Sequence, residues 1–348
     1  MAMYSHAMPD QLSVGIVGAS GFTGAELLRL LATHPAMNVR AVTGDTQAGT
    51  AVADLYPSLA PAYGDLTYVR YEEAGLEDLD LVFAGLPHRA SQEIVSQLID
   101  DVDHVIDLSA DFRLNDPMVY EKWYETPHVV PELLDQFAYG LPELFRDDLK
   151  QRKHVAVPGC YPSTAVLPLA PLLRSGLISE TGIIIDAASG VSGAGRAPKP
   201  NTTFCSVDED FSAYGVLTHR HTPEIEQTLG TPVLFTPHLA PMNRGILATC
   251  YAKPVGTTST DDLLTALGNF YADEPFVVVS ERLPTTKATL GSNVAHISAR
   301  YDDRTDTVIA FCALDNLCKG SSGGAIQSAN IVAGLDETLG LPLTGLMP

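Results

Sequence analysis

Positive charge is scarce in this sequence. Its 348 residues include 21 Lys and Arg against 42 Asp and Glu, which gives a formal net charge of -21 at pH 7. So acidic a surface repels nucleic acids and anionic membranes, and we expect neither as a partner. The hydrophobic fraction of 45% is nevertheless high enough for a substantial core, which excludes a disordered chain.

The sequence also lacks paired cysteines, a signal peptide and a long apolar run. Its cysteines, at positions 160, 205, 250, 312 and 318, are scattered without a CxxC pair. We therefore expect neither a disulfide framework nor a metal site. The start MAMYSHAMPDQ has no basic head or apolar stretch, and no uncharged apolar run reaches the roughly 18 residues of a membrane span. A reducing cytoplasm is the expected compartment.

Strand-like apolar runs alternate with helical segments in the first half of the chain. LSVGIVG (12–18) precedes the helical AELLRLL, and VRAVTG (39–44), LDLVFAGLP (79–87) and HVIDLS (104–109) follow. This alternation predicts an α/β fold with an N-terminal Rossmann-type, doubly wound parallel sheet over residues 1–157.

The rhythm changes after residue 157. GIIIDAASG, PVLFTPHLAP, RGILATCYAKPV, NVAHISARYD and TVIAFCALDN are strand-like, with fewer helices between them. Residues 158–319 are therefore predicted to form a second, α+β domain with a mixed or antiparallel sheet for catalysis, substrate binding and oligomerisation. The helical stretch within 320–348, SSGGAIQSANIVAGL, is expected to pack back onto the first domain.

Three glycines predict a dinucleotide site, with a purely structural turn as the alternative. Gly18, Gly21 and Gly24 follow a strand and open a helix, where glycine permits a tight turn, close approach of pyrophosphate and strand–helix packing. Asp45 lies 21 residues after Gly24, where an acidic residue binds the ribose hydroxyls of NAD. No arginine follows the strand to bind a 2′-phosphate, although Thr43 and Thr46 offer hydroxyls. NAD and NADP both remain open.

Cys160 stands between a strand and a helix in HVAVPGCYPSTAVLPL (154–169). Backbone N–H groups at a helix start stabilise a thiolate and lower the pKa of the thiol, and they can also donate to an oxyanion. A buried structural cysteine is the alternative. Together with a nicotinamide domain, the position predicts a dehydrogenase or reductase that works through a thioester.

A thioester route also requires an acid–base group for the substrate oxygen. His219 and His221 in THRHTPEIEQ flank a predicted helix start, where an imidazole pKa near neutrality is expected. Either one can fill the role, or lie on the surface. His88 and His238 are weaker candidates in loops.

Arginines in loops are the candidate anchors for an anionic substrate. Arg113 in DLSADFRL, Arg196 in SGVSGAGRAP and Arg244 in PMNRG fit this description. A structural ion pair is the alternative for each of them.

Eight segments together resemble one enzyme family, the N-acetyl-gamma-glutamyl-phosphate reductases. They are GASGFTGAELLRLL, GLPH, DLSADFRL, VPGCYPSTA, SGVSGAGR, THRHTPEI, LAPMNRGILAT and DNLCKGSSGGAIQSAN, and they run from about residue 13 to 335 in the family's order. The resemblance implies a fold of the semialdehyde dehydrogenase and glyceraldehyde-3-phosphate dehydrogenase type. It also implies NADPH-dependent reduction of N-acetyl-L-glutamyl 5-phosphate to the 5-semialdehyde in arginine biosynthesis.

The resemblance further implies roles for individual residues. Cys160 matches the nucleophile, His219 the acid–base residue, and His221 and Arg113 residues at the substrate, where Arg196 is also expected. The residues that match the cofactor site are Gly18, Ser20, Gly21, Phe22, Thr23, Gly24, Gly193 and Asn316. The family forms homo-oligomers, commonly tetramers. Asp45 departs from the pattern, because an acid is unfavourable beside a 2′-phosphate.

Two rival functions are less consistent with the sequence. A reductase of carrier-protein-linked aminoadipyl or glutamyl phosphate would dock an acidic carrier, which a net charge of -21 opposes. A catalytically inactive nucleotide-binding regulator would have no reason to retain both Cys160 and His219. We therefore favour an enzyme that acts on a free small molecule.

Overall fold

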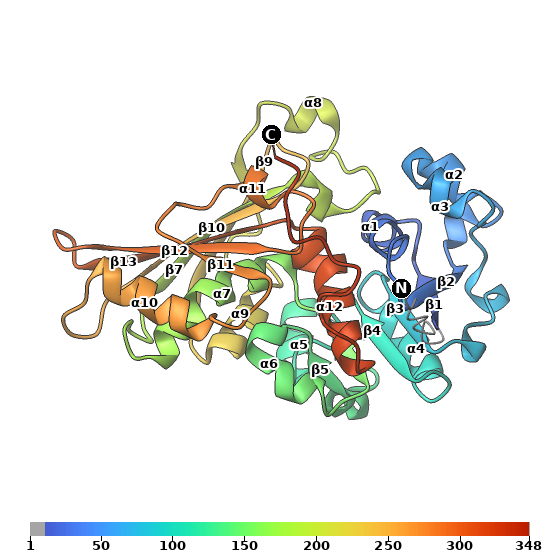
Figure 1. Ribbon diagram of the computed structural model, residues 1–348, viewed down its shortest axis with the longest axis horizontal. Helices are drawn as coiled ribbons and strands as arrows, with labels where there is room; N and C mark the ends of the chain where they lie inside the picture. The colour runs from blue at the N-terminus through green and yellow to red at the C-terminus, as the bar shows by residue number, and fades with distance from the viewer. Residues whose placement is uncertain (1–10, 348) are drawn as a thin grey trace, which may run out of the picture.

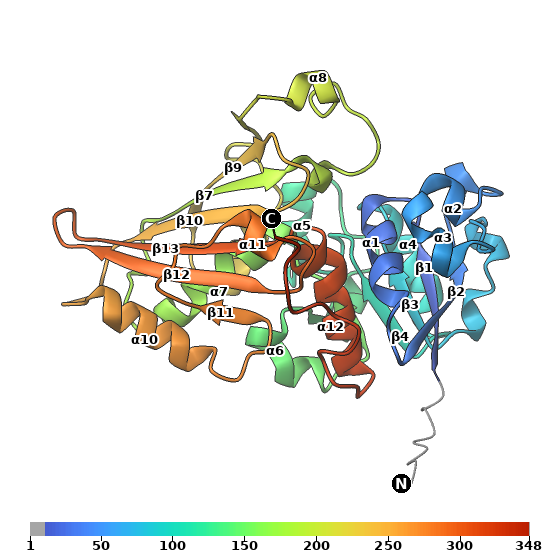
Figure 2. The ribbon, with the colours of Figure 1, turned by 45° about the horizontal axis from the view of Figure 1, so that its top comes forward.

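The computed structural model describes residues 11–347, which form two sheets with their associated helices (Figures 1 and 2). The start MAMYSHAMPD, in which no signal peptide was predicted, lies outside these residues. Within 11–347, no helix is both long and apolar enough to cross a membrane.

The first sheet has six parallel strands in the order β2-β1-β3-β4-β6-β5, which confirms the predicted Rossmann-type sheet. Its strands are β1 (Leu12–Val17), β2 (Met37–Val42), β3 (Leu81–Ala84), β4 (His104–Asp107), β5 (Phe137–Tyr139) and β6 (His154–Ala156). The longer helices between them are α1 (Phe22–Leu31), α4 (Ala90–Leu98), α5 (Pro117–Tyr124) and α6 (Pro142–Leu149). The order reverses between β1 and β3, and ligands bind such sheets outside the carboxyl ends of the strands at this point.

Short helical turns fill the connections of the first sheet. They are η1 (Asp45–Gln47), α2 (Val52–Leu55), η2 (Pro57–Leu59), α3 (Ala60–Tyr63), η3 (Tyr71–Glu73), η4 (Leu76–Asp78) and η5 (Pro131–Gln136). Proline opens two of them, η2 and η5, where its missing N–H costs no hydrogen bond.

The second sheet has seven strands in the order β11-β12-β13-β10-β7-β9-β8. The pairs β11/β12 and β7/β9 are parallel and the others antiparallel, so the predicted mixed sheet is confirmed. Its strands are β7 (Ile183–Gly190), β8 (Ser212–Ala213), β9 (Val233–Ala240), β10 (Ile246–Ala252), β11 (Val277–Val279), β12 (Ala295–Asp302) and β13 (Thr307–Leu314). The helical elements are α7 (Cys160–Arg174), η6 (Val191–Ala194), α8 (Phe204–Val207), α9 (Thr222–Leu229), α10 (Thr260–Phe270) and α11 (Thr286–Thr289).

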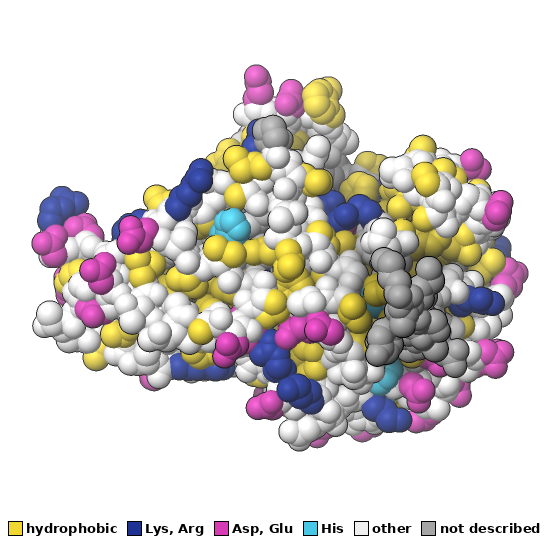
Figure 3. Space-filling model, in the orientation of Figure 1, with side chains coloured by type: hydrophobic (Ala, Val, Ile, Leu, Met, Phe, Trp, Pro, Cys, Tyr) yellow, Lys and Arg dark blue, Asp and Glu magenta, His cyan; other side chains and the backbone are white. Residues whose placement is uncertain are grey.

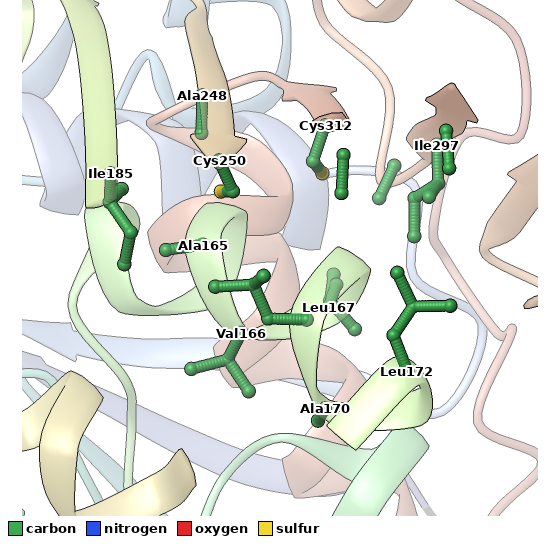
Figure 4. Packing of buried hydrophobic residues seen from close by; sticks show 14 of the residues in the cluster. Ala165, Val166, Leu167, Ala170, Leu172, Ile185, Ala248, Cys250, Ile297 and Cys312 are labelled. Atoms are coloured by element: carbon green, nitrogen blue, oxygen red, sulfur yellow. The ribbon is translucent and has the colours of Figure 1, made fainter. Parts of the chain in front are cut away.

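Helix α7 packs its apolar side chains against one face of the second sheet (Figure 4). The helix tolerates Pro171, which cannot donate to the carbonyl of Leu167, because the hydroxyl of Tyr271 donates to that carbonyl at 2.6 Å. Cys250 and Cys312 project from the strands into this core, as Figure 4 shows. They behave there as small hydrophobic residues.

The C-terminal helix crosses back to the first sheet. A single π-turn, η7 (Cys318–Ser322), leads into α12 (Gly323–Val332), which contacts α1, α6, β4 and β6. Figures 1 and 2 both show α12 between the two sheets. The predicted boundary at residues 157/158 stays a prediction.

Ion pairs with buried carboxylates connect the elements of the first sheet to those of the second. Arg244 donates to Glu26 on α1 at 2.7 Å and to Asp315 at 2.9 Å, so it is a structural residue rather than a substrate anchor. Lys319 Nζ donates to Glu143 at 2.5 Å, and both side chains are almost fully buried. Two oppositely charged groups that meet out of water hold η7 against α6.

Candidate active site

The glycine turn lies at the carboxyl end of β1. Gly18 has a φ of 75°, and a Cβ there would lie 2.4 Å from the carbonyl oxygen of Gly85, which follows β3. A Cβ at Gly24 would lie 2.4 Å from the carbonyl oxygen of Ala19. At Gly21, the N-cap of α1, a Cβ would meet only one atom, at 3.6 Å. Packing therefore excludes side chains at two positions, and the third leaves open backbone for a phosphate, as a dinucleotide site requires.

The remaining residues of the turn are held by their neighbours. The carbonyl of Ser20 accepts the hydroxyl of Tyr56 at 2.8 Å. Phe22 and Thr23 begin α1, and the carbonyl of Thr23 accepts the hydroxyl of Ser322 at 2.9 Å. The backbone of the turn is therefore fixed from both sides.

The loop after β2 has little that could bind the 2′-phosphate of NADP. Asp45 is exposed in η1. Thr43 is buried, and its hydroxyl oxygen accepts the N–H of Gly18 at 3.2 Å, so it serves the turn instead.

Arg196, from the second domain, lies near the tyrosines beside the glycine turn, Tyr56 and Tyr68. The segment between β7 and α8 reaches toward α1 in Figures 1 and 2. Burial raises the pKa of Tyr56 and that of Tyr68, the latter to about 12, while the nearby guanidinium of Arg196 acts in the opposite direction on both. The Nε of Arg196 is buried, and no residue of 11–347 forms a hydrogen bond with it. Arg196 does not line the cavity that contains Cys160, so this placement does not support the predicted substrate contact.

A cavity of about 590 Å³ lies at the carboxyl edge of the first sheet. It brings together the predicted residues Cys160, His219, His221 and Arg113 with Gly193. Cys160 follows β6, and the glycine turn follows β1. Because the strands are parallel, the thiol and the turn share one edge of the sheet.

Cys160 is the first residue of α7, directly after the N-cap Gly159, and it is half-buried. Burial raises the pKa of its thiol to about 11, although the Arg113 guanidinium and the N–H of Tyr161 oppose the rise. The expectation of a lowered thiol pKa is therefore wrong for the free protein, because desolvation outweighs the helix start. At neutral pH the thiol keeps its proton until a base removes it.

Both histidines of the HRH segment are neutral at pH 7. Burial, and secondarily Arg220, lowers the pKa of His219 to about 4. Burial, and then the charges of His219 and Arg113, holds the pKa of His221 well below its usual value. The expected values near neutrality are therefore wrong. Because the N–H of His221 donates to Nδ1 of His219 at 3.1 Å, the neutral His219 ring carries its proton on Nε2.

His221 packs directly against the residue before the thiol. A Cβ at Gly159 would lie 2.5 Å from Nε2 of His221, so only glycine leaves room for the ring. The Nδ1 of His221 is buried and has no hydrogen-bond partner among the residues that the structure describes. The two imidazole rings lie 4.8 Å apart in an edge-to-face arrangement.

Glu224 was missed by the sequence reasoning. Its carboxylate is buried and accepts the N–H of Gly159 at 2.8 Å and the hydroxyl of Tyr139 at 2.7 Å. The other oxygen faces Arg113 at 3.5 Å. A carboxylate in the first turn of α9, next to two histidines, was the available signal. Glu224 joins α9 to the backbone beside Cys160.

The guanidinium of Arg113 already donates hydrogen bonds to backbone carbonyls of the protein. Its Nε donates to the carbonyl of Val157 at 2.7 Å and its Nη2 to that of Leu108 at 3.0 Å. The residue is buried yet lines the cavity. It therefore supplies positive charge close to the thiol with few free donors.

The residues predicted near the nicotinamide differ in exposure. Gly193 in η6 lines the cavity. Asn316 is buried: its Oδ1 accepts the N–H of Gly245 at 2.7 Å and its Nδ2 donates to Ser192 at 2.9 Å. Asn316 thus positions the turn that carries Gly193.

Comparison with known families covers nearly the whole chain. The semialdehyde dehydrogenase NAD-binding domain matches residues 13–152, and the semialdehyde dehydrogenase dimerisation domain matches 160–316. The N-acetyl-gamma-glutamyl-phosphate reductase of Citrifermentans bemidjiense is 47% identical over 347 residues, covering 97% of this chain and 100% of that protein. That of Rhodospirillum rubrum is 48% identical over 354 residues, covering 98% and 100%.

Solved structures share the fold at low identity. Aspartate semialdehyde dehydrogenase II of Vibrio cholerae, complexed with ASA, has a TM-score of 0.72 at 14% identity, covering 94% of this chain and 99% of that one. The Candida albicans enzyme with NADP has a TM-score of 0.65 at 14% identity, covering 93% and 99%. These structures support the two-domain architecture alone.

Proposed function

The chain belongs to the N-acetyl-gamma-glutamyl-phosphate reductase family, and we propose that Cys160, His219 and His221 carry out the family's reaction. That reaction reduces N-acetyl-L-glutamyl 5-phosphate to N-acetyl-L-glutamate 5-semialdehyde and phosphate, a step of arginine biosynthesis. The presence of these three side chains in one cavity, at the same sheet edge as the glycine turn, carries the proposal.

The first step attaches the acyl group to Cys160. Its sulfur forms a bond to the acyl carbon, the bond from that carbon to the phosphate oxygen breaks, and phosphate leaves with the electron pair. The raised thiol pKa means that a base must first take the proton. We assign this role to the neutral imidazole of His221, which packs against Gly159, the residue before the thiol, in place of the substrate contact that the resemblance implied.

His219 acts on the acyl oxygen. Its Nε2–H donates to that oxygen as negative charge develops, both during thiol attack and after reduction. A bound nicotinamide nucleotide supplies the hydride to the thioester carbon, and the glycine turn is the group that would hold its pyrophosphate. Collapse of the thiohemiacetal then releases the aldehyde and returns the electron pair to Cys160, which recovers its proton from His221.

The test is phosphate-dependent oxidation of N-acetyl-L-glutamate 5-semialdehyde, followed by absorbance as the nucleotide is reduced. Wild type should turn over, and Cys160→Ser should lose activity while binding nucleotide normally. If Cys160→Ser retained a tenth of wild-type activity, the covalent route would be excluded.

We propose NADP as the preferred nucleotide, although Asp45 is the residue expected of an NAD site. The support is Arg196, whose charge lies beside Tyr56 and Tyr68 next to the glycine turn. Arg196→Gln should raise the KM for NADPH by roughly tenfold and barely change that for NADH. Arg304, whose side chain is 81% exposed, provides the matched control for loss of a charge. An equal effect on both nucleotides would contradict the assignment.

We also propose a homotetramer in a reducing cytoplasm. Ile184 and Leu234 are 38% and 48% exposed on the sheet face opposite α7. In Figure 3, hydrophobic and uncharged side chains cover much of the middle of the face, and charged side chains lie along its edges and in its lower and right-hand middle. The matched dimerisation domain and the free cysteines favour this assignment. Light scattering after size-exclusion chromatography would give the subunit number.

A further inference from the structure

Arg220, between the two histidines, lines the cavity, and no carboxylate of the described part of the chain pairs with it. Its guanidinium lies over the ring of Tyr124, 5.0 Å from the centroid, and donates through Nη1 to Nε2 of His88. It joins no ion pair among residues 11–347. In a chain with twice as many acidic as basic residues, an arginine whose contacts are both neutral is suited to an anion from outside.

The partner His88 is held in place by an unusual backbone. Arg89 has a φ of 76°, which a non-glycine residue rarely adopts. Its N–H donates to both carboxylate oxygens of Asp111, at 3.0 and 2.8 Å, and its Nη2 donates to the carbonyl of Tyr124 at 3.0 Å. These bonds tie the loop that carries His88 to α5, which carries Tyr124. Backbone strain kept by such bonds points to a functional role for the side chain it presents.

The other cations of the cavity are less suited to hold a planar anion. Arg113 donates to two backbone carbonyls and faces Glu224. Lys199 is exposed, and its single ammonium group cannot make a bidentate contact. Arg220 alone combines a pre-positioned guanidinium with most of its five N–H donors free of acceptors among the described residues.

We propose that Arg220, positioned by His88 and Tyr124, binds the carboxylate of the substrate and sets the specificity for an acylamino acid. This inference rests on the proposed function. The phosphoryl group departs when the thioester forms, whereas the carboxylate stays with the acyl group through hydride transfer. A rigidly held bidentate donor suits the anion that remains, because it keeps the bound acyl group oriented.

The experiment compares two aldehydes in the oxidative direction, with phosphate and nucleotide. One is N-acetyl-L-glutamate 5-semialdehyde, and the other is 4-acetamidobutanal, in which hydrogen replaces the carboxylate. Arg220→Gln should lower kcat/KM for the first by roughly 10- to 100-fold, mainly through KM. Its kcat/KM for the second, and its KM for phosphate, should stay within about twofold of wild type. Lys199→Gln, which removes a charge from the same cavity, should leave the ratio of the two aldehydes unchanged.

Three results would overturn the proposal: an equal loss on both aldehydes, a raised KM for phosphate instead, or the same change of ratio in Lys199→Gln. Wild type provides a measurement that is independent of variant folding, because it must prefer the carboxylate-bearing aldehyde by a comparable factor. Equal efficiency of wild type on both aldehydes would also refute the role of Arg220. Wild type inactive on N-acetyl-L-glutamate 5-semialdehyde would instead refute the proposed function.

Discussion

Gly159 offers a direct test of the geometry around the thiol. Its backbone, with φ of -66° and ψ of 152°, is open to any residue, so alanine there causes no backbone strain. The added Cβ would lie 2.5, 2.7 and 2.8 Å from three atoms of the His221 ring. Carbon contacts normally lie at about 3.5–4.0 Å, so the ring must move by about 1 Å.

The expected consequence is loss of catalysis with retention of fold. A shift of about 1 Å in a catalytic group can lower the rate by about 10²-fold, which is our expectation for kcat of Gly159→Ala. Alanine is a poorer N-cap than glycine, which should cost about 1 kcal/mol or less in unfolding free energy. Gly268→Ala is the matched control, because a Cβ there meets nothing within 4 Å. This control should stabilise α10 by roughly 0.5–1 kcal/mol and leave kcat unchanged.

A double-mutant cycle decides whether the effect of Gly159→Ala passes through His221. The assay is steady-state oxidation of the semialdehyde by Gly159→Ala, His221→Ala and the double variant, with nucleotide binding measured by titration. Without the ring, the added methyl has nothing to displace, so the double variant should match His221→Ala. Two losses that multiply, or a Gly159→Ala kcat within threefold of wild type, would refute the reasoning.

Three further predictions follow from the charges in the structure. Because burial raises the pKa of Cys160 to about 11, its alkylation by iodoacetamide should accelerate about tenfold per pH unit from pH 7 to about 10. A Cys205→Ser background removes the exposed cysteine, and a plateau below pH 8 would contradict the assignment. His219→Asn should lower kcat by about 10²–10⁴, because it removes the proton donor to the acyl oxygen. In the wild type, kcat/KM should show no imidazole titration between about pH 6 and 8, because burial lowers the pKa of His219 to about 4. Lys319→Met should reduce the unfolding free energy by about 3–5 kcal/mol at pH 7, measured with urea, because it leaves the buried Glu143 carboxylate without its positively charged partner. Burial raises the pKa of Glu143, and Lys319 reverses this effect in the wild type. In Lys319→Met the carboxyl should therefore be protonated at about pH 4, and the loss of unfolding free energy should be smaller there than at pH 7. A loss of unfolding free energy that does not change with pH would contradict this explanation.

Local sequence patterns were sufficient for the elements of the fold and for the chemistry of the turns. A Cβ at Gly24 would meet the carbonyl oxygen of the nearby Ala19, so the need for glycine there is visible in a local strand–turn–helix pattern. The contact of Gly18 with Gly85 joins segments that are far apart in the chain. The sequence distinguished the parallel sheet from the mixed one, because strand-like apolar runs alternate with helical segments only in the first half of the chain. Such runs can be recognised because the pattern of apolar residues reflects which side chains a strand buries. The placement of Cys160 at a helix start was evident for the same reason.

Burial and long-range proximity were decided only by the tertiary structure. The sign of the thiol pKa shift depends on how much protein surrounds Cys160, which exceeds the effect of its own helix start. No pattern pairs Arg220 with His88, or Glu224 with Gly159, because these partners are far apart along the chain. The first pair meets where the two domains pack, and the second where α7 and α9 pack within the second domain. Spacing along the sequence thus determined which residue types stand at each turn, whereas packing determined their protonation, their partners and the ligands they can bind.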